Sequence, residues 1–324
     1  MKYIRVLIMV VFVAGVFSCN RDELFEREQY KNVVAMLSED GYNVFAEEHE
    51  LGGAGTETEG WVVASCGGAL EIREAISISL TEDGSLLDHY NTGNYDVDES
   101  KYAHYLSKDR YVIENPGITI PAGERTGRMK IKIRATGLSP DSVYLIPLRV
   151  NTYSAYEFNP EKNSVLYRVL LKNFYATQKT ATLYNFRGVR NGANIMGNKQ
   201  VFPVSGNRVR IMAGNLDFEA KTDVIKNGSI LLEIDGQNNV RITSWNKINV
   251  RQMNAVDDGP GGIYYDPSPT ANTNWDKNYP NVFKIEDDGY KTYKTFLLQY
   301  KYEYQGTGYT MKEELRLEYN PQKN

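Results

Sequence analysis

Apolar and polar residues alternate with a period of two over many short stretches, which is the pattern of strands with one buried face. The alternation is clearest in residues 75–80 (AISISL) and 129–134 (MKIKIR). Three more runs rich in β-branched and aromatic residues predict strands over residues 117–123, 143–150 and 165–171. Pro147 favours an edge strand or a bulge in the second of these runs. Two short helices are predicted near residues 85–90 and 99–106.

The second half of the chain shows the same alternation together with hairpin signals. Residues 230–234 and 240–244 flank a short loop, DGQNN, and therefore predict an antiparallel hairpin. Residues 292–302 and 309–319 flank a second glycine-containing loop, QGTG, and the first of these strands presents an aromatic face that includes Tyr300. No segment here has the 3.6-residue period of a helix. We expect a meandering antiparallel sheet that is closed or sandwiched so that its edges are covered.

The composition changes after Asn173, and residues 174–180 are the last place for a linker before the second β-rich block. This change predicts two domains, which comprise residues 31–176 and residues 177–324. A length of 324 residues agrees with two domains of ordinary size.

The N-terminus has the features of an export signal. Lys2 and Arg5 precede an apolar run over residues 6–17, which is too short for a membrane-spanning helix. The segment that ends in Ser18-Cys19 resembles a bacterial lipoprotein box, so residues 1–18 are interpreted as a signal peptide and Cys19 as the lipid attachment site. Residues 19–30 then form a charged tether. The alternative is an ordinary secretory signal in which the cysteine has no role.

The net charge argues against a nucleic-acid partner, and the cysteine content argues against an intrachain disulfide. The formal net charge is −4, from 37 basic and 41 acidic side chains, so the chain lacks the positive field that nucleic-acid binding requires. Membrane contact is expected through the lipid alone. Once Cys19 is acylated, Cys66 has no partner for an intrachain disulfide, and its apolar neighbours predict a buried, unreactive thiol.

Motifs for catalysis are scarce, so the chain is not expected to be an enzyme. It has three histidines and lacks a nucleophile elbow, an H-E-x-x-H pair and a P-loop. We expect no cofactor and no metal site, and interpret residues 287–289 (DDG) as a tight turn rather than a calcium loop. A glycoside hydrolase remains the less favoured alternative, because it needs only two carboxylates at a suitable separation.

Several stretches are similar to a type of outer-membrane lipoprotein from Bacteroidota. They comprise residues 76–80, 87–91, 94–95, 118–124, 144–148 and 296–302. The resemblance covers nearly all of the mature chain. It implies a mostly β fold, with an N-terminal immunoglobulin-like β-sandwich followed by an antiparallel β-barrel or β-sandwich domain. It also implies a lipid-anchored protein of the outer membrane and cell surface that binds glycans beside a TonB-dependent transporter.

Residues 254–281 contain the side-chain types that a sugar site needs. A pyranose has an apolar C–H face and a rim of hydroxyls, so it pairs with flat aromatic rings and with carboxylates or amides. The candidate platforms are Trp275, Tyr264, Tyr265 and Tyr279, and the candidate hydrogen-bonding groups are Asn274 and Asp276. The alternative is that these aromatic residues pack on the sheet or anchor the loop. Trp61 and Trp245 stand in strand-like contexts and are expected in the core.

The expected function is therefore non-catalytic glycan binding at the cell surface as part of a polysaccharide-uptake system. The alternative is a structural or adhesin-type protein whose exposed strand edges pair with a partner.

Overall fold

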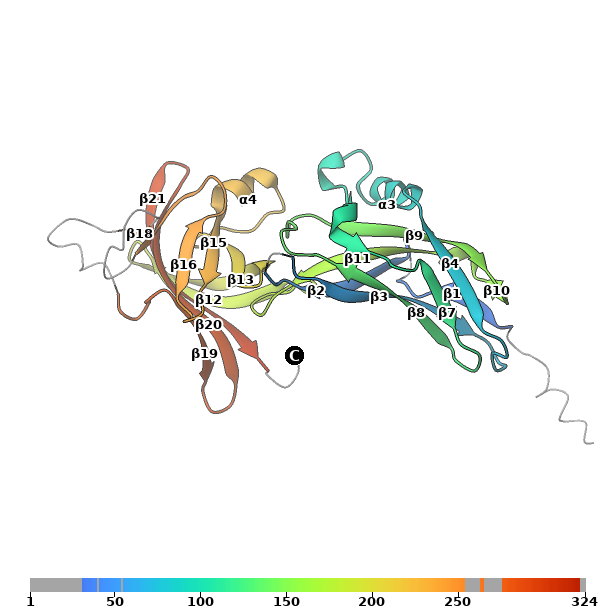
Figure 1. The fold of residues 1–324 in the computed structure, drawn as a ribbon. Coiled ribbons are helices and arrows are strands. Elements are labelled where there is room, and N and C mark those ends of the chain that lie inside the picture. Colours follow the sequence, from blue (N-terminus) through green and yellow to red (C-terminus); the bar gives the residue numbers. More distant parts are fainter. Residues whose placement is uncertain (1–30, 40, 54, 254–262, 265–275, 321–324) are drawn as a thin grey trace, which may run out of the picture.

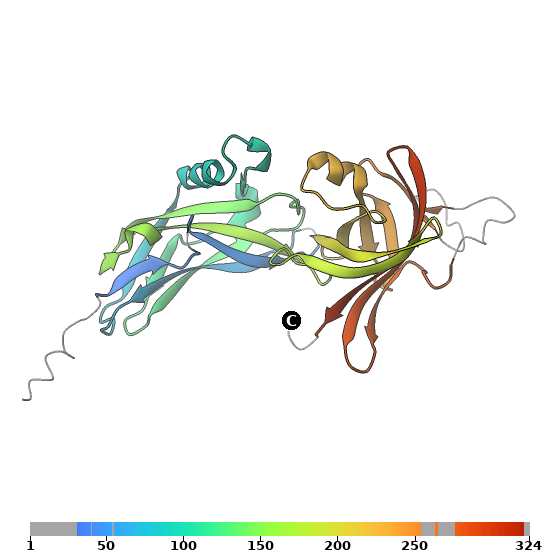
Figure 2. The ribbon, with the colours of Figure 1, turned by 180° about the vertical axis from the view of Figure 1, so that it is seen from behind.

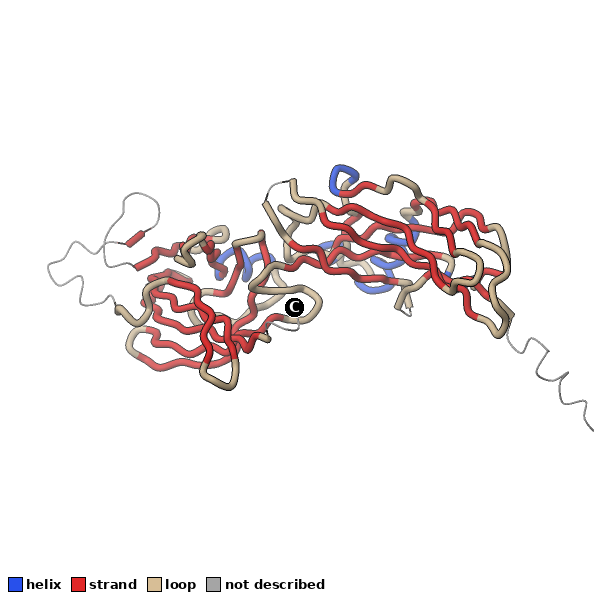
Figure 3. The backbone as a smooth tube through the Cα atoms, turned by 60° about the horizontal axis from the view of Figure 1, so that its bottom comes forward, coloured by secondary structure: helices blue, strands red, loops and turns tan. Residues whose placement is uncertain are grey.

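The computed structural model describes residues 31–39, 41–53, 55–253, 263–264 and 276–320. These residues form two β-rich domains that lie end to end (Figure 1). Seen from behind, each domain keeps its own sheets (Figure 2). Strands dominate both domains and helical segments are few and short (Figure 3). The prediction of a mostly β fold is confirmed, and of the two forms expected for the C-terminal domain, a barrel or a sandwich, the structure has a nearly closed barrel. Neither α-helix in the described part of the chain is long and apolar enough to cross a membrane.

Five strands form the first sheet of the N-terminal sandwich. In spatial order they are β10 (Glu157–Phe158), β1 (Val33–Met36), β3 (Thr58–Gly67), β8 (Thr126–Ile133) and β6 (Tyr111–Val112). The alternation predicted for residues 129–134 is present in β8, where Met129 and Ile131 are buried and Arg128 and Lys130 are exposed. This sheet therefore has one face toward the core and one polar outer face.

The second sheet of the sandwich packs against the first. It contains β2 (Val44–Glu50), β11 (Ser164–Lys172), β9 (Tyr144–Tyr153), β4 (Ile76–Glu82) and β7 (Gly117–Ile120), with β5 (His104–Tyr105) paired to β9. Pro147 lies in β9, which is an inner strand, so its predicted edge position is wrong. The ladder between β4 and β9 does shift register, but between Ser79 and Leu80 of β4 rather than at Pro147.

Helical structure in the sandwich is limited to the connections. The predicted first helix is α3 (Ser85–Tyr95), which buries Leu87 and Tyr90 against Leu145 of β9. The predicted second helix is only the 3₁₀ turn η1 (Glu99–Lys101), because the chain then enters β5. Two further 3₁₀ turns are η2 (Lys108–Arg110) and η3 (Pro160–Lys162).

The C-terminal domain is one ten-stranded sheet that curls into a barrel. In spatial order its strands are β16 (Val240–Ser244), β15 (Ser229–Ile234), β14 (Arg208–Met212), β13 (Ala193–Ser205), β12 (Thr182–Arg190), β21 (Thr307–Tyr319), β20 (Thr292–Tyr304), β17 (Asn249–Met253) and β18 (Ile263–Tyr264), with β19 (Val282–Asp287) also paired to β20. The short helix α4 (Thr222–Gly228) precedes β15 and has no counterpart among the predicted elements.

The barrel closes through isolated hydrogen bonds instead of a continuous ladder. The Ile242 N–H of β16 donates to the Gln252 side-chain oxygen of β17 at 2.7 Å. Val240 N–H donates to the Asn281 carbonyl oxygen at 2.8 Å, and Phe283 N–H donates to the Asn238 carbonyl oxygen at 2.9 Å. Strand β16 therefore meets β17 and β19, which hides the apolar interior and leaves the sheet nearly closed.

The chain passes from sandwich to barrel between the end of β11 and the start of β12, and the predicted boundary at residues 176 and 177 falls in this connection. The Asn173 amide donates to the carbonyl oxygens of Ser205 (2.7 Å) and Arg208 (3.0 Å) in the barrel. The Gln178 amide donates to the Pro140 carbonyl oxygen of the sandwich at 2.8 Å. These bonds fix the connection to both domains.

Candidate functional site

The predicted site residues fall into two groups in the structure. Trp275, Tyr265 and Asn274 lie outside the described residues. Tyr264 belongs to β18, and its backbone pairs in parallel with Met253 of β17. The role predicted for these four residues stays a prediction.

Asp276 and Tyr279 are described, and they share one turn. The Asp276 carboxylate accepts hydrogen bonds from the backbone N–H of Asn278 (3.0 Å) and from its side-chain amide (2.9 Å). Its other oxygen lies 3.3 Å from Lys312 Nζ. The hydrogen bond from the Asn278 N–H, followed by Lys312, lowers the pKa of Asp276. Tyr279 N–H donates to the Asp276 carbonyl oxygen at 2.9 Å, so the two residues are held close together. The Asp276 carboxylate is thus already engaged within the protein.

Both tryptophans that were expected in the core are only half-buried. Trp61 occupies an outward position of β3, whereas Gly60 and Val62 on either side of it are buried. Trp245 follows the last residue of β16 and lies 5.3 Å from the Arg210 guanidinium. The error at Trp61 has a simple cause, since β3 carries apolar residues on both faces and its sequence does not reveal which face is buried.

Tyrosines line the end of the barrel near the turn that joins β20 to β21. Tyr302 and Tyr309 are cross-strand partners whose rings stack with centroids 5.0 Å apart and an interplanar angle of 23°. Tyr304 is the next inward residue of β20 and is half-buried. The Arg190 guanidinium lies 5.1 Å from the Tyr309 ring and donates to the Asn215 side-chain oxygen. We call this end of the barrel, with Tyr302, Tyr304 and Tyr309, the tyrosine mouth.

Two adjoining cavities open at the tyrosine mouth. The larger, of about 490 Å³, lies between α4 and the turn after β20, and the smaller has about 230 Å³. Asn249 and Glu303 line both cavities, and the Asn249 amide donates to the Glu303 carboxylate at 3.3 Å. The larger cavity is also lined by Asp223, Asn227, Lys247 and Tyr304. The smaller cavity is also lined by Arg251, Tyr302 and Tyr309. Barrel mouths are common places for ligand pockets, and this one combines aromatic rings with carboxylates and amides.

A buried polar cluster lies further inside the barrel, next to these tyrosines. The Tyr300 hydroxyl donates to the Glu313 carboxylate at 2.7 Å and accepts from the Gly214 N–H at 2.7 Å. The other oxygen of Glu313 pairs with Lys199, and both side chains are almost fully buried. Burial lowers the pKa of Lys199, although Glu313 opposes this change. The cluster satisfies its own polar groups and so supports the tyrosine mouth from within.

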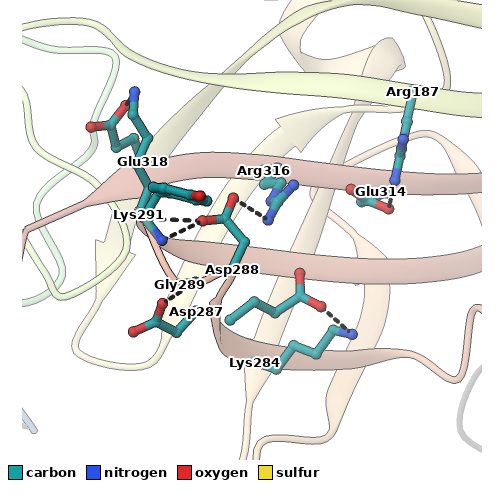
Figure 4. Close-up of polar contacts among 11 residues, drawn as sticks. Arg187, Lys284, Asp287, Asp288, Gly289, Lys291, Glu314, Arg316 and Glu318 are labelled. Atoms are coloured by element: carbon teal, nitrogen blue, oxygen red, sulfur yellow. Dashed lines mark hydrogen bonds and ion pairs between the residues drawn. The ribbon is translucent and has the colours of Figure 1, made fainter.

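The outer face of the barrel carries several charge pairs. Figure 4 shows Arg187 paired with Glu314, and Lys291 paired with Glu318, along neighbouring strands. Asp288 accepts hydrogen bonds from the N–H groups of Tyr290 and Lys291, and Asp287 accepts one from Gly289. The DDG segment is therefore a tight turn, as predicted. Within the described residues, no group of three or more histidine, cysteine or acidic side chains could hold a metal ion.

The sequence reveals some residues of the tyrosine mouth but not others. The period-two aromatic face of residues 292–302 is visible in the sequence, and its members Tyr300 and Tyr302 are buried in the barrel. Asn249 and Glu303 were missed because they meet only across the β17–β20 ladder, and no local sequence signal records that pairing.

Two family models match the chain, one for each domain. A family model for the C-terminal domain of a two-domain family matches residues 163–316, and its N-terminal counterpart matches residues 30–157. No curated protein matches the chain.

Solved structures share the whole two-domain architecture. A Bacteroides ovatus protein of unknown function has a TM-score of 0.61 at 14% identity, over 88% of this chain and 94% of that chain. Another from B. ovatus, also of unknown function, has a TM-score of 0.59 at 15% identity, over 92% and 93%. An auxiliary nutrient binding protein from Bacteroides thetaiotaomicron has a TM-score of 0.53 at 14% identity, over 84% and 90%. The chain therefore matches an N-terminal and a C-terminal family model over successive stretches, and it shares the fold of two-domain Bacteroides proteins whose function is largely unknown.

Proposed function

We propose that this protein binds glycans without cleaving them and that the tyrosine mouth is the binding site. In this proposal a lipid on Cys19 holds the protein at the outer-membrane surface, and the bound glycan passes to a neighbouring TonB-dependent transporter. The observation that carries the proposal is the pair of adjoining cavities lined by Tyr302, Tyr304 and Tyr309 together with Asn249 and Glu303. A nutrient-binding function in one protein of the same fold supports the ligand class.

The chemistry of the tyrosine mouth suits a hydroxyl-rich ligand. A tyrosine ring offers an apolar face to the C–H side of a sugar, and its hydroxyl can bond to the rim of the same sugar. Glu303 accepts hydrogen bonds, whereas the Asn249 amide can both donate and accept. Each sugar hydroxyl must give up bound water to make such bonds, so the affinity of one site is expected at about 1 µM to 1 mM.

The test is calorimetric titration of the soluble protein, residues 31–324, with a panel of host and plant polysaccharides. We expect at least one neutral glycan to bind. Tyr309→Ala and Tyr304→Ala should each weaken that binding about tenfold, which corresponds to about 1.4 kcal/mol. Both side chains are only partly buried, so the variants are expected to keep the fold, and circular dichroism checks this.

Tyr290→Ala is the matched control, because Tyr290 is 96% exposed in the turn between β19 and β20 and lines neither cavity. It should bind like the wild type. Glycan binding that is unchanged in folded Tyr304→Ala and Tyr309→Ala would refute the site. Release of new reducing ends from the bound glycan would refute the non-catalytic role.

A further inference from the structure

A separate cavity lies on the N-terminal domain, beside the outward-facing residues of β3 and β8. It has a volume of about 440 Å³, within the ordinary range of ligand pockets. Trp61 of β3 and Arg128 of β8 line it, and the Arg128 guanidinium lies 4.3 Å from the centre of the Trp61 ring. The lining also includes Glu59, Asn115, Gly117 and Lys130. We call this cavity the Trp61 pocket.

The strand beneath Trp61 is held firmly in place. The Glu47 carboxylate accepts hydrogen bonds from the Trp61 N–H at 2.8 Å and from the Tyr167 hydroxyl at 2.6 Å. Gly60 allows this close contact, because a Cβ atom there would lie 2.0 Å from the Tyr167 hydroxyl. These buried hydrogen bonds fix the backbone of β3 at Trp61. The backbone that carries the indole ring therefore has to move little when a ligand binds.

The charges along β8 are unevenly paired. Lys130 pairs with Glu59 at 2.6 Å, Lys132 with Glu114 at 2.6 Å, and Arg134 with Glu57 at 2.6 Å. Arg128 is exposed on the same face, and no carboxylate of the described residues lies in ion-pair range of its guanidinium. Its main contact is the Trp61 ring. The Trp61 pocket therefore keeps one uncompensated positive charge.

We propose that the Trp61 pocket binds the carboxylate of an acidic sugar, such as a uronic acid unit within a glycan chain. A guanidinium that stacks on indole uses only its flat face, so its N–H edge stays available for two parallel hydrogen bonds to a carboxylate. Trp61 and Asn115 both line the pocket, so an aromatic ring and an amide are available to a sugar whose carboxylate binds Arg128. The anion site follows from the geometry alone, whereas the choice of a sugar as the carrier rests on the proposed glycan-binding function.

The experiment titrates soluble protein with galacturonic acid oligomers and with neutral galactose oligomers of the same length. We expect the acidic oligomer to bind and its affinity to fall as sodium chloride rises from 50 to 300 mM, because salt screens the ion pair. Arg128→Gln should weaken this binding at least tenfold, and Arg128→Lys should restore only part of it. Arg134→Gln is the matched control, since Arg134 follows β8 directly, is partly exposed, and does not line the Trp61 pocket.

Acidic-oligomer binding that is absent, or equal in the wild type and Arg128→Gln, would overturn the proposal. Equal affinity for acetate would overturn the assignment to a sugar. Tyr309→Ala separates the two proposals, because it should weaken neutral-glycan binding at the tyrosine mouth and leave acidic-oligomer binding unchanged. If Tyr309→Ala abolishes acidic binding and Arg128→Gln does not, then the acidic sugar belongs to the barrel and the Trp61 pocket is refuted.

Discussion

His49 is a fully buried histidine in the N-terminal sandwich and takes no part in either proposed site. Its ring nitrogens lie 2.7 Å from the Thr58 hydroxyl and 2.8 Å from the Tyr167 hydroxyl. A neutral imidazole has one donor and one acceptor nitrogen, which matches these two hydroxyl partners. Burial lowers the pKa of His49 to about 4, and the nearby Glu47 offsets only part of this effect.

This depressed pKa makes stability depend on pH in a defined direction. The unfolded chain takes up a proton at His49 near pH 6.5, whereas the folded chain does so only near pH 4. Stability from this residue is therefore complete above pH 6.5 and is lost as the pH falls toward 4, by up to about 3 kcal/mol. Chemical denaturation between pH 7 and pH 4 should show a smaller loss in His49→Gln than in the wild type. Parallel pH profiles for the two proteins would contradict this assignment.

The burial of a single residue could be predicted where most of its sequence neighbours are apolar. Cys66 was expected to be a buried, unreactive thiol, and it is 1% exposed with a pKa raised by burial. Trp61 was placed in the core incorrectly, because Val62 and Val63 give no indication of which face of β3 is inward. The partner of a buried charge was also not predictable, since Lys199 and Glu313 are far apart in the sequence and lie on β13 and β21, which meet only through their shared neighbour β12.

Strands β12 and β21 lie close together at Gly188, which leaves no room for a side chain. A Cβ atom at this position would lie 2.3 Å from the Lys312 carbonyl oxygen and 2.9 Å from the end of the Met311 side chain. The first of these contacts is with backbone, which cannot move without shifting β21. Glycine is thus required here by the spacing of two strands, since its φ is not in the left-handed region.

Gly188→Ala should therefore destabilise the barrel by about 1–3 kcal/mol, as overpacking does elsewhere. Gly197→Ala is a matched control, because Gly197 lies in the neighbouring strand β13 and its Cβ would sit 3.7 Å from the Phe186 ring, an ordinary contact. The control should be neutral or slightly stabilising, since alanine restricts the unfolded chain more than glycine does. Urea denaturation measures both. Equal effects of the two substitutions would show that strand spacing at Gly188 is unimportant.

Elements were predictable where the period-two pattern and a turn lie next to each other in sequence. The hairpins of β15 with β16 and of β20 with β21 follow this rule. The parallel pairs of β1 with β10 and of β2 with β11 were not predicted, because their partners are distant in the sequence and share no turn. Helix α4 was missed because its seven residues are too few to show a helical period.

An ion pair crosses the junction between the two domains, in addition to the hydrogen bonds of Asn173 and Gln178. The fully buried guanidinium of Arg210 in the barrel makes a bidentate pair with Asp141 of the sandwich. The same guanidinium lies 4.4 Å from the Phe202 ring and 5.3 Å from the Trp245 ring. Aromatic rings stabilise a buried cation only weakly, so the Asp141 carboxylate is the main group that stabilises the buried charge of Arg210.

Asp141→Asn should loosen the junction and cost about 3 kcal/mol, because it removes the charge opposite a buried guanidinium. Calorimetry should show a lower transition temperature, and small-angle X-ray scattering should show greater variation in interdomain distance. Arg208→Gln is the control, since Arg208 and its partner Glu233 are partly exposed and such a pair contributes less than about 1 kcal/mol. A scattering curve unchanged by Asp141→Asn would show that the other junction contacts suffice.

The pairing of β12 with β21 has a consequence for the order of folding. The sandwich sheets are complete once β11 has been synthesised, whereas β12, the first strand of the barrel, pairs with β21, the last. Such distant pairing requires closure of a long loop before it gains any contacts, so barrel formation is expected to be slow. During synthesis the sandwich can fold first, while the barrel strands stay incompletely paired until β21 has been made.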